Sequence, residues 1–263
     1  MIRKIALPLL LISIFSVAFS AGNKTTSKPF AETGFAVVEL FTSEGCSSCP
    51  PADALLAEIA KESQNKSVYL LAFHVDYWDR LGWKDRFSSP KFSARQNQYA
   101  NWLNLKTIYT PQVVINGGKE FVGSEENIMR NSIKTALAKP TGGNLQISLG
   151  KTDKHRLILN YTTDQQTDGF SLAVALVSSN ASSQVLKGEN KGKTLAHVQI
   201  VRQFETFALQ GKTKGSVDMQ VDEVDGKVPT ELIAFLQNNK TGKIIATSKL
   251  NNLFINHLTN KSE

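Results

Sequence analysis

Two short apolar runs, separated by one helical segment, constrain the fold of this chain most strongly. Residues 35–41 (FAVVELF) are rich in β-forming apolar side chains, as is typical of a strand buried on both faces, and residues 68–75 (VYLLAFHV) form a second such run. The segment 50–60 between them begins with two prolines, which the first turn of a helix tolerates, and its apolar residues then share one face. Strand, helix and strand in this order predict a parallel pair joined by a right-handed crossover.

The only two cysteines of the chain, Cys46 and Cys49, stand directly before that helix in the stretch TSEGCSSCPPAD. A disulfide across two residues closes almost no loop, and loop closure is where a structural disulfide is thought to gain most of its benefit. The pair therefore indicates chemistry. At the helix start, Cys46 faces unpaired backbone N–H groups and the positive end of the helix dipole, which favours the thiolate. We expect Cys46 to be an exposed nucleophile and Cys49 the more buried resolving thiol.

The start of the chain has the layout of a secretory signal peptide. A charged start (MIRK) precedes an apolar run over residues 5–19 and small residues at the cleavage positions. An uncleaved membrane anchor is the alternative, but the run is short for a span and Pro8 interrupts it. We therefore expect residues 1–20 to be removed after Ser20 and residues 21–32 to be a disordered mature terminus. The mature protein is then periplasmic or secreted, without a membrane span, and there a vicinal cysteine pair can be oxidised.

The stretch of residues 76–106 differs in character, because it holds all three tryptophans of the chain. A Ser-Pro pair opens a helical segment within it, so the sequence predicts a helical insertion. Trp78 and Trp83 lie in its loop-like part, DYWDRLGWKD, and are placed to wall a groove beside Cys46. Exposed aromatic side chains next to a reactive thiol would bind apolar segments of a partner.

A hairpin and a helix close this first half of the chain. Thr110-Pro111 leads into a β-hairpin over residues 112–122, whose Asn-Gly turn supplies the positive φ that tight turns need. A helix is expected from Ser124 to Ala138.

The segment KPTGG, residues 139–143, indicates a domain boundary, because the pattern of the sequence changes after it from helical to strand-like segments. Short alternating stretches with polar turns predict an all-β, sandwich-like domain over residues 143–263. Strands are expected at residues 145–149, 156–161, 171–177, 197–207, 215–221, 231–236 and 243–248.

A strand–CxxC–helix–strand order, followed by Thr-Pro before a hairpin and a closing helix, resembles the thioredoxin superfamily. The motifs FTSEGCSSCPPADALL, FHVDYWDRLGWKD, FSARQNQY and YTPQVVING are similar to those of an exported bacterial thioredoxin-like family of unassigned function, and GENKGKTLAHVQIVRQF fits a segment of that family. The resemblance implies an α/β thioredoxin-like domain at residues 33–139, with the insertion at about 76–106. It also implies a cis bond before Pro111, with Thr110 offering backbone hydrogen bonds to a bound substrate.

The chain departs from working thioredoxins at a group that moves protons. That superfamily carries a buried carboxylate six residues before the first cysteine, where this chain has Leu40. Glu39 is adjacent, but strand alternation points it to the opposite face. His74, at the end of the second predicted strand, is the other titratable side chain near the expected site. Glu39 and His74 are therefore the candidates for proton transfer, and the Ser-Ser pair between the cysteines does not indicate the direction of the redox reaction.

The sequence thus predicts an exported thiol–disulfide oxidoreductase or exchange protein that acts on protein thiols and is recycled by a second redox protein. Its redox group is the Cys46–Cys49 disulfide, and no other cofactor is expected. A copper-binding protein is the alternative, because thiolates and imidazole select copper or zinc, and Cys46, Cys49 and His74 would be the ligands. A non-catalytic partner-binding module is the third possibility. Nucleic acid is not an expected partner, because the lysines are scattered, although the net charge is +7.

Overall fold

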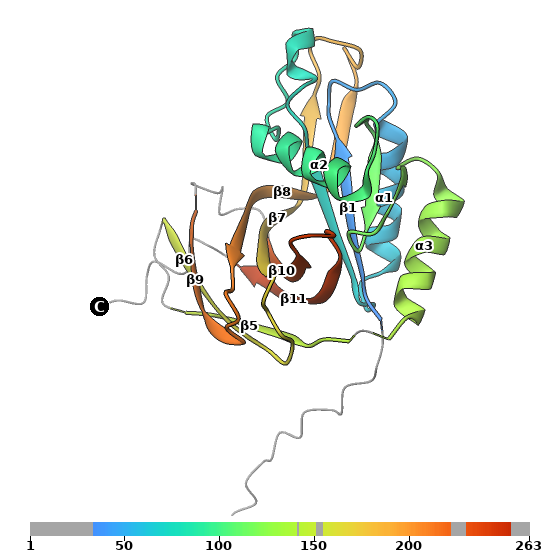
Figure 1. Cartoon of the computed structure of the whole chain (residues 1–263). Helices are drawn as coiled ribbons and strands as arrows, with labels where there is room; N and C mark the ends of the chain where they lie inside the picture. The colour runs from blue at the N-terminus through green and yellow to red at the C-terminus, as the bar shows by residue number, and fades with distance from the viewer. Residues whose placement is uncertain (1–33, 141, 151–154, 222–229, 254–263) are drawn as a thin grey trace, which may run out of the picture. The chain divides into compact units, whose positions relative to one another are not determined.

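The computed structural model describes residues 34–140, 142–150, 155–221 and 230–253 (Figure 1). The expected signal peptide, residues 1–20, and the segment 21–32 lie outside these ranges, so both stay predictions. Within the described residues, no helix combines the length and the apolar character that crossing a membrane requires.

The two apolar runs form the parallel strand pair that the sequence predicts. Strand β1 (Ala36–Thr42) and strand β2 (Val68–His74) pair in parallel along their whole length, and helix α1 (Pro50–Glu62) connects them. Every residue of β1 is buried, because the strand lies inside a sheet and is covered on both faces. Helix α1 buries Leu55, Leu56 and Ile59 against that sheet.

The other elements of the first half also lie where the sequence predicts them, except that the last helix begins at Glu126, with Glu125 and not Ser124 at its N-cap. Strands β3 and β4 form the antiparallel hairpin, and its turn residues Asn116 and Gly117 both have positive φ, 47° and 65°. Helix α2 begins after Ser89, whose side chain accepts a hydrogen bond from the N–H of Lys91 and so caps the helix. The bounds are η1 (a 3-10 helix, Asp79–Leu81), α2 (Pro90–Leu103), β3 (Gln112–Ile115), β4 (Lys119–Val122) and α3 (Glu126–Ala138).

The second half consists of the predicted strands, and three of them, β7, β8 and β11, are longer than expected by four residues or more. Strands β7 and β8 have 15 residues each and pair as one long antiparallel hairpin. The bounds are β5 (Leu145–Leu149), β6 (Arg156–Thr163), β7 (Phe170–Gln184), β8 (Thr194–Ala208), β9 (Lys214–Gln220), β10 (Thr230–Asn238) and β11 (Ile244–Leu253).

These strands do not form a separate sandwich, so the predicted fold class is wrong. They continue the first sheet instead, giving eight strands in the order β11-β10-β7-β8-β2-β1-β3-β4, while β5, β6 and β9 form a second sheet of three. The junction is the parallel contact of β8 with β2 at Ile200 and Ala72. Of the described residues, 44% lie in strands and 21% in helices, so the chain is mostly β and is not an α/β thioredoxin-like domain followed by a β-sandwich. Strand alternation in a sequence shows which residues are buried, but it does not show which strands pair.

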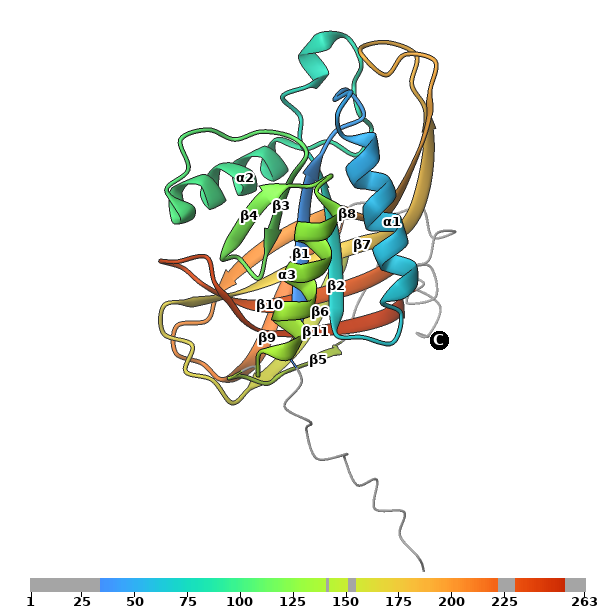
Figure 2. The same cartoon turned by 90° about the vertical axis from the view of Figure 1, so that its right-hand side faces the viewer.

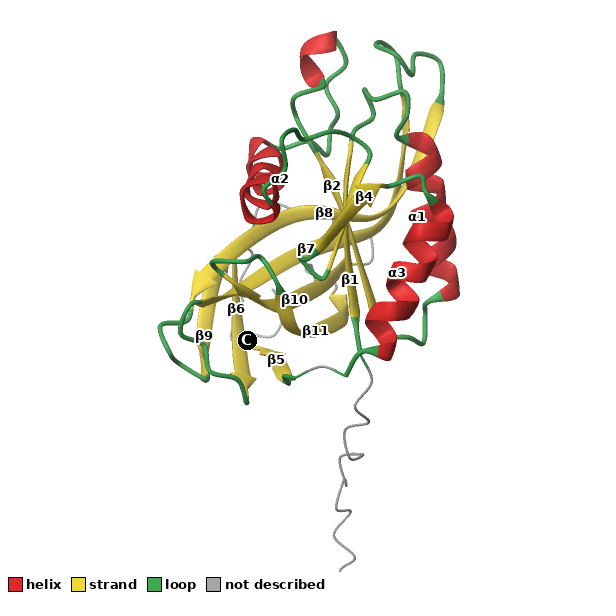
Figure 3. Cartoon of the chain, turned by 45° about the vertical axis from the view of Figure 1, so that its right-hand side comes forward, coloured by secondary structure: helices red, strands yellow, loops and turns green. Residues whose placement is uncertain are grey.

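The large sheet buries a core on each of its faces. Helices α1 and α3 cover one face of the β1–β4 part, and α2 lies on the other side (Figure 3). The small sheet of β5, β6 and β9 packs on the β7–β10–β11 part. On the side of α2, residues of both halves share one core: Phe41 and Phe73 of β1 and β2 belong to the same cluster as Val201 and Phe235 of β8 and β10. The cysteine-bearing strands and the β-rich half are therefore packed as one body.

Candidate functional site

The two cysteines are joined in a disulfide at the start of α1. Their Cα atoms are 5.4 Å apart, and the N–H of Cys49 donates to the carbonyl of Cys46 at 3.2 Å. Neither cysteine has exposed surface, whereas Ser47 and Ser48 between them are exposed. The expectation that Cys46 is exposed is therefore wrong for the disulfide form. An attacking thiol can reach this disulfide only if the structure around it moves.

Thr110 and Pro111 lie beside the disulfide, and the peptide bond between them is cis. The hydroxyl oxygen of Ser48 is 3.4 Å from both the Cys46 sulfur and the Thr110 carbonyl oxygen, and so links the two segments. Trp78 donates from its indole N–H to the Thr110 hydroxyl at 2.8 Å. The structure thus brings together the cysteines, the Thr-Pro pair and one of the two predicted tryptophans.

The tip of the β7–β8 hairpin, residues 185–193, covers the cysteine loop. At the top of Figure 2 the tip reaches past β2 to the loop before α1. Asn190, which is fully buried there, donates from its side-chain amide to the carbonyl oxygens of Glu44 and Cys46, both at 2.9 Å. The neighbouring Glu189 accepts a hydrogen bond from the N–H of Ser47 at 2.9 Å. The β-rich half therefore supplies part of the site, which the sequence analysis missed.

Behind the cysteine loop lies a buried acid–histidine cluster of Glu44, Asp53, His74, Asp85 and His197. The His74 ring nitrogen Nδ1 is 2.6 Å from an Asp85 carboxylate oxygen. The His197 ring lies between two carboxylates, with Nε2 at 3.4 Å from Glu44 and Nδ1 at 3.7 Å from Asp53. The two imidazole rings meet edge to face, with centroids 4.8 Å apart.

Burial and close charges pull the pKa values in this cluster in opposite directions. Burial raises the pKa of Asp53, and the nearby histidines only partly offset that effect. Burial also raises the pKa of Glu44, but the polar groups of His197, Ser183 and Trp83 beside its carboxylate outweigh that effect, so that pKa lies below its usual value.

The His74–Asp85 pair is shifted in both of its members. Burial lowers the pKa of His74, but the charge and hydrogen bond of Asp85 outweigh it, so the pKa lies above its usual value. Burial raises the pKa of Asp85, but the charge of His74 outweighs it and lowers the pKa. Each partner thus favours the charged form of the other.

Two of the predicted site residues, Glu39 and Trp83, do not contact the cysteines. Glu39 faces the other side of the sheet, where Arg95 holds its carboxylate at 2.5 Å, so it is remote from the cysteine loop and no candidate for proton transfer there. Trp83 is half-buried and donates at 2.7 Å to Glu44, so it closes the acid–histidine cluster rather than walling a groove. His74 belongs to that same cluster.

The sequence carried a signal for some of the missed residues but not for others. Asp53 follows Cys49 by four positions on a predicted helix, which places it one turn away on the same face. Nothing in the sequence connects His197, Asn190 or Glu189 with a loop that lies more than 140 positions earlier.

The predicted copper site stays a prediction. In the described part of the chain, no three His, Cys, Asp or Glu side chains form a group suited to hold a metal ion. His74 uses one ring nitrogen for Asp85 in the disulfide form.

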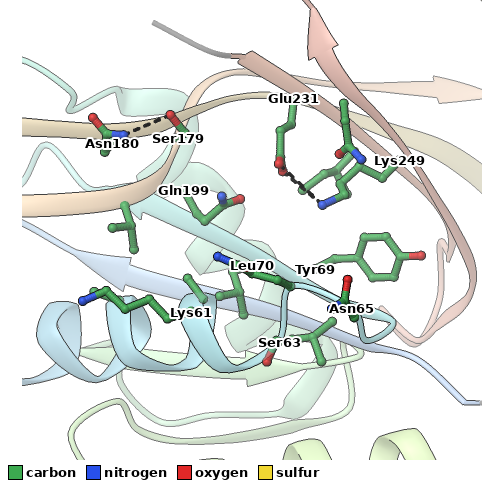
Figure 4. Close-up of a pocket in the computed structure, with 17 residues that line it drawn as sticks. Lys61, Ser63, Asn65, Tyr69, Leu70, Ser179, Asn180, Gln199, Glu231 and Lys249 are labelled. Atoms are coloured by element: carbon green, nitrogen blue, oxygen red, sulfur yellow. Dashed lines mark hydrogen bonds and ion pairs between the residues drawn. The ribbon is translucent and has the colours of Figure 1, made fainter.

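A polar pocket of about 770 Å³ opens on another part of the surface (Figure 4). It lies where β2 and β8 diverge from their single contact, and the end of α1, with β10 and β11, completes its wall. Tyr69, Asn180 and Gln199 line it, together with the Lys249–Glu231 ion pair. None of the predicted site residues borders this pocket.

Comparisons with known proteins identify a family and related folds. A family model described as "Protein of unknown function (DUF1223)" matches residues 37–237. The chain is similar to the crystal structure of a protein from Agrobacterium tumefaciens, with 24% identity and a TM-score of 0.63 over 90% of this chain and 98% of that one. It is also similar to HBP35 of Porphyromonas gingivalis, with 15% identity and a TM-score of 0.59 over 88% and 77% of the two chains. No curated protein sequence matches.

Proposed function

The chain belongs to the DUF1223 family, and we propose that it is a thiol–disulfide oxidoreductase or exchange protein that acts on protein thiols. The observation that carries this proposal is the Cys46–Cys49 disulfide at the start of a helix, in contact with the Thr110-Pro111 segment through Ser48. A disulfide that spans two residues stabilises a fold little, and one at a helix start favours thiolate chemistry once it is reduced.

The proposed reaction uses the two sulfurs in turn. In the reduced protein, the Cys46 thiolate attacks a disulfide of the partner, forms a mixed disulfide and releases one partner thiolate. The Cys49 sulfur then attacks the Cys46 sulfur, which restores the intramolecular disulfide and releases the second partner thiolate. The partner disulfide is reduced and the Cys46–Cys49 dithiol is oxidised, and the same steps run in reverse when the partner is a dithiol.

The surroundings of the cysteines suit a polypeptide substrate. Trp78 packs against the backbone beside Cys46, since a Cβ added at Gly45 would lie 3.1 Å from the Trp78 Cβ. An extended partner segment next to Thr110 would meet that aromatic surface. Leu81 in η1 and Leu186 in the tip of the β7–β8 hairpin are also exposed, by 47% and 60%. We take the order of elements around the cysteines as support for a relationship to the thioredoxin superfamily, and a periplasmic or secreted location follows from the proposed signal peptide.

Trapping of the mixed disulfide tests this function. The purified protein, Cys49→Ser and Cys46→Ser are reduced and mixed with insulin, whose disulfides serve as substrate. We expect the wild type to exchange disulfides with insulin, Cys49→Ser to accumulate a covalent complex that dithiothreitol releases, and Cys46→Ser to do neither. Ser47→Ala is the matched control, because it alters a neighbouring exposed residue and leaves both sulfurs. Equal behaviour of wild type and Cys46→Ser would refute the proposal.

A further inference from the structure

The acid–histidine cluster places five ionisable side chains in a buried region, where their charges have to neutralise one another. The side chains of His74, Asp85 and Glu44 have no exposed surface, and those of His197 and Asp53 are 1% and 8% exposed. Three ionised carboxylates and two neutral imidazoles carry a net charge of −3, so the cluster is electrically neutral only when it binds three further protons. Because an unpaired buried charge is costly, a proton that enters or leaves this cluster must be matched by a change close by.

The nearest chemical change that the chain offers is the opening and closing of the disulfide. Asp53 lies one helical turn after Cys49, and its N–H donates to the Cys49 carbonyl at 3.1 Å. Glu44 lies two residues before Cys46, and Asn190 ties the carbonyls of both to one amide group. The cluster is thus attached to the backbone on both sides of the cysteine pair.

Several polar atoms of the cluster lack partners, which leaves them available for a proton. In the described part of the chain, the unpartnered buried atoms include both ring nitrogens of His197, Nε2 of His74, one oxygen of Glu44 and the Thr42 hydroxyl. The His197 nitrogens face Asp53 and Glu44 at 3.7 and 3.4 Å, longer than a hydrogen bond. An imidazole in this position can take a proton at one nitrogen and release it from the other.

We propose that Asp53 receives the proton of the Cys49 thiol during disulfide formation and that His197, held between Asp53 and Glu44, passes it on. This inference rests on the proposed function. As the Cys49 sulfur attacks Cys46 in the mixed disulfide, its S–H bond breaks, the new S–S bond forms and the partner leaves as a thiolate. The Cys49 proton moves to the Asp53 carboxylate, and the partner thiolate takes its proton from water.

The charges around Asp53 agree with this role. The groups that face it are His197 from β8, His74 from β2, Asp85 from the insertion and Thr42 from β1. Burial raises the pKa of Asp53 and so makes its carboxylate a better base than an exposed aspartate.

The rate at which the mixed disulfide resolves, measured against pH, tests the proposal. Reduced wild type, Asp53→Asn and His197→Gln are mixed with excess insulin, and the lifetime of the mixed disulfide is followed by acid quenching. We expect Asp53→Asn to resolve about 100-fold more slowly at pH 7 and to recover as the pH approaches the thiol pKa of about 8.5. Alkylation of Cys46 by iodoacetamide should stay within about twofold of wild type, because Asp53 acts on the other cysteine. Asp218→Asn, an exposed position on β9, is the matched control.

The outcomes separate this inference from the proposed function. If wild type exchanges disulfides while Asp53→Asn and His197→Gln resolve with its rate and pH profile, the function stands and the proton path is refuted. If wild type forms no mixed disulfide with insulin, the function and the inference fall together. Should one variant fail to fold, the other variant decides, because the proposal requires both side chains.

Discussion

Asn190→Ala tests whether the β7–β8 hairpin tip controls access to the disulfide. The side-chain amide of Asn190 is the donor to the carbonyl oxygens of Glu44 and Cys46, each at 2.9 Å, and it is fully buried. Its side-chain oxygen accepts from Lys193 at 3.0 Å. Alanine removes this donor. The carbonyl groups of Glu44 and Cys46 each lose one hydrogen bond, but both stay buried.

The expected size of the effect follows from those two carbonyls. The Glu44 carbonyl is left unsatisfied, which costs about 1–3 kcal/mol, whereas the Cys46 carbonyl keeps the N–H of Cys49 and loses one hydrogen bond, worth about 0.5–1.5 kcal/mol. Together these losses reduce the free energy of unfolding by about 1.5–4.5 kcal/mol. The same loss favours local opening of the tip, because the contact exists only in the closed form. Since 1.4 kcal/mol corresponds to a factor of ten, the open population should rise at least about tenfold.

Two measurements check this reasoning. Urea unfolding gives the loss of stability, and the rate of reduction of the Cys46–Cys49 disulfide by dilute dithiothreitol reports access. We expect the reduction rate of Asn190→Ala to rise about tenfold or more. Lys193→Met is the matched control, because it removes the contact to the Asn190 oxygen and keeps the amide donor, so its disulfide should be reduced at nearly the wild-type rate. A destabilised Asn190→Ala protein with an unchanged reduction rate would show that the tip does not gate the disulfide.

Three further predictions concern the fold and its pH dependence. Arg95→Met leaves Glu39 buried without its cation, so urea unfolding should show a loss of about 3–5 kcal/mol, while disulfide exchange per folded molecule stays unchanged. A Cβ at Gly123 would lie 2.9 Å from a methyl group of β1 and 3.3 Å from the cis-proline, so Gly123→Ala should cost about 1–3 kcal/mol in the same assay. The raised pKa of His74 and the lowered pKa of Asp85 mean that their pairing stabilises the protein above about pH 4 and below about pH 6.5. The stability difference between wild type and His74→Gln should therefore be largest in that window and shrink as the pH rises through the raised pKa of His74, and a difference that grows above pH 7 would contradict the assignment.

The parts of the fold that the sequence predicted are those in which local pattern decides the structure. The β1–α1–β2 unit followed from two apolar runs and two prolines, and the β3–β4 turn followed from the Asn116-Gly117 pair, which the structure places at positive φ. The sequence also predicted the strands of the second half. It did not predict that these strands continue the first sheet, because β8 pairs with β2 at one residue pair, Ala72 and Ile200, and no pattern in either strand encodes that contact.

The candidate site divides in the same way. The disulfide, the cis bond before Pro111 and the contact of Trp78 with Thr110 involve segments whose order along the chain the sequence shows. The position of Asp53 near Cys49 could also have been predicted, because the two residues are one helical turn apart. His197 and Asn190 were not, since they reach the site only through the long β7–β8 hairpin.

That hairpin explains why the cysteines of this chain are covered. Strands β7 and β8 run from the core that they share with β1 and β2 to the cysteine loop, so one hairpin carries both His197, inside the cluster, and Asn190, on the loop. A movement of the tip that uncovers Cys46 therefore acts on the strand that carries His197, whose ring packs against His74. We therefore expect access to the disulfide to be coupled to the arrangement of the acid–histidine cluster, because both depend on this hairpin and the β-rich half shares its core with the cysteine-bearing strands.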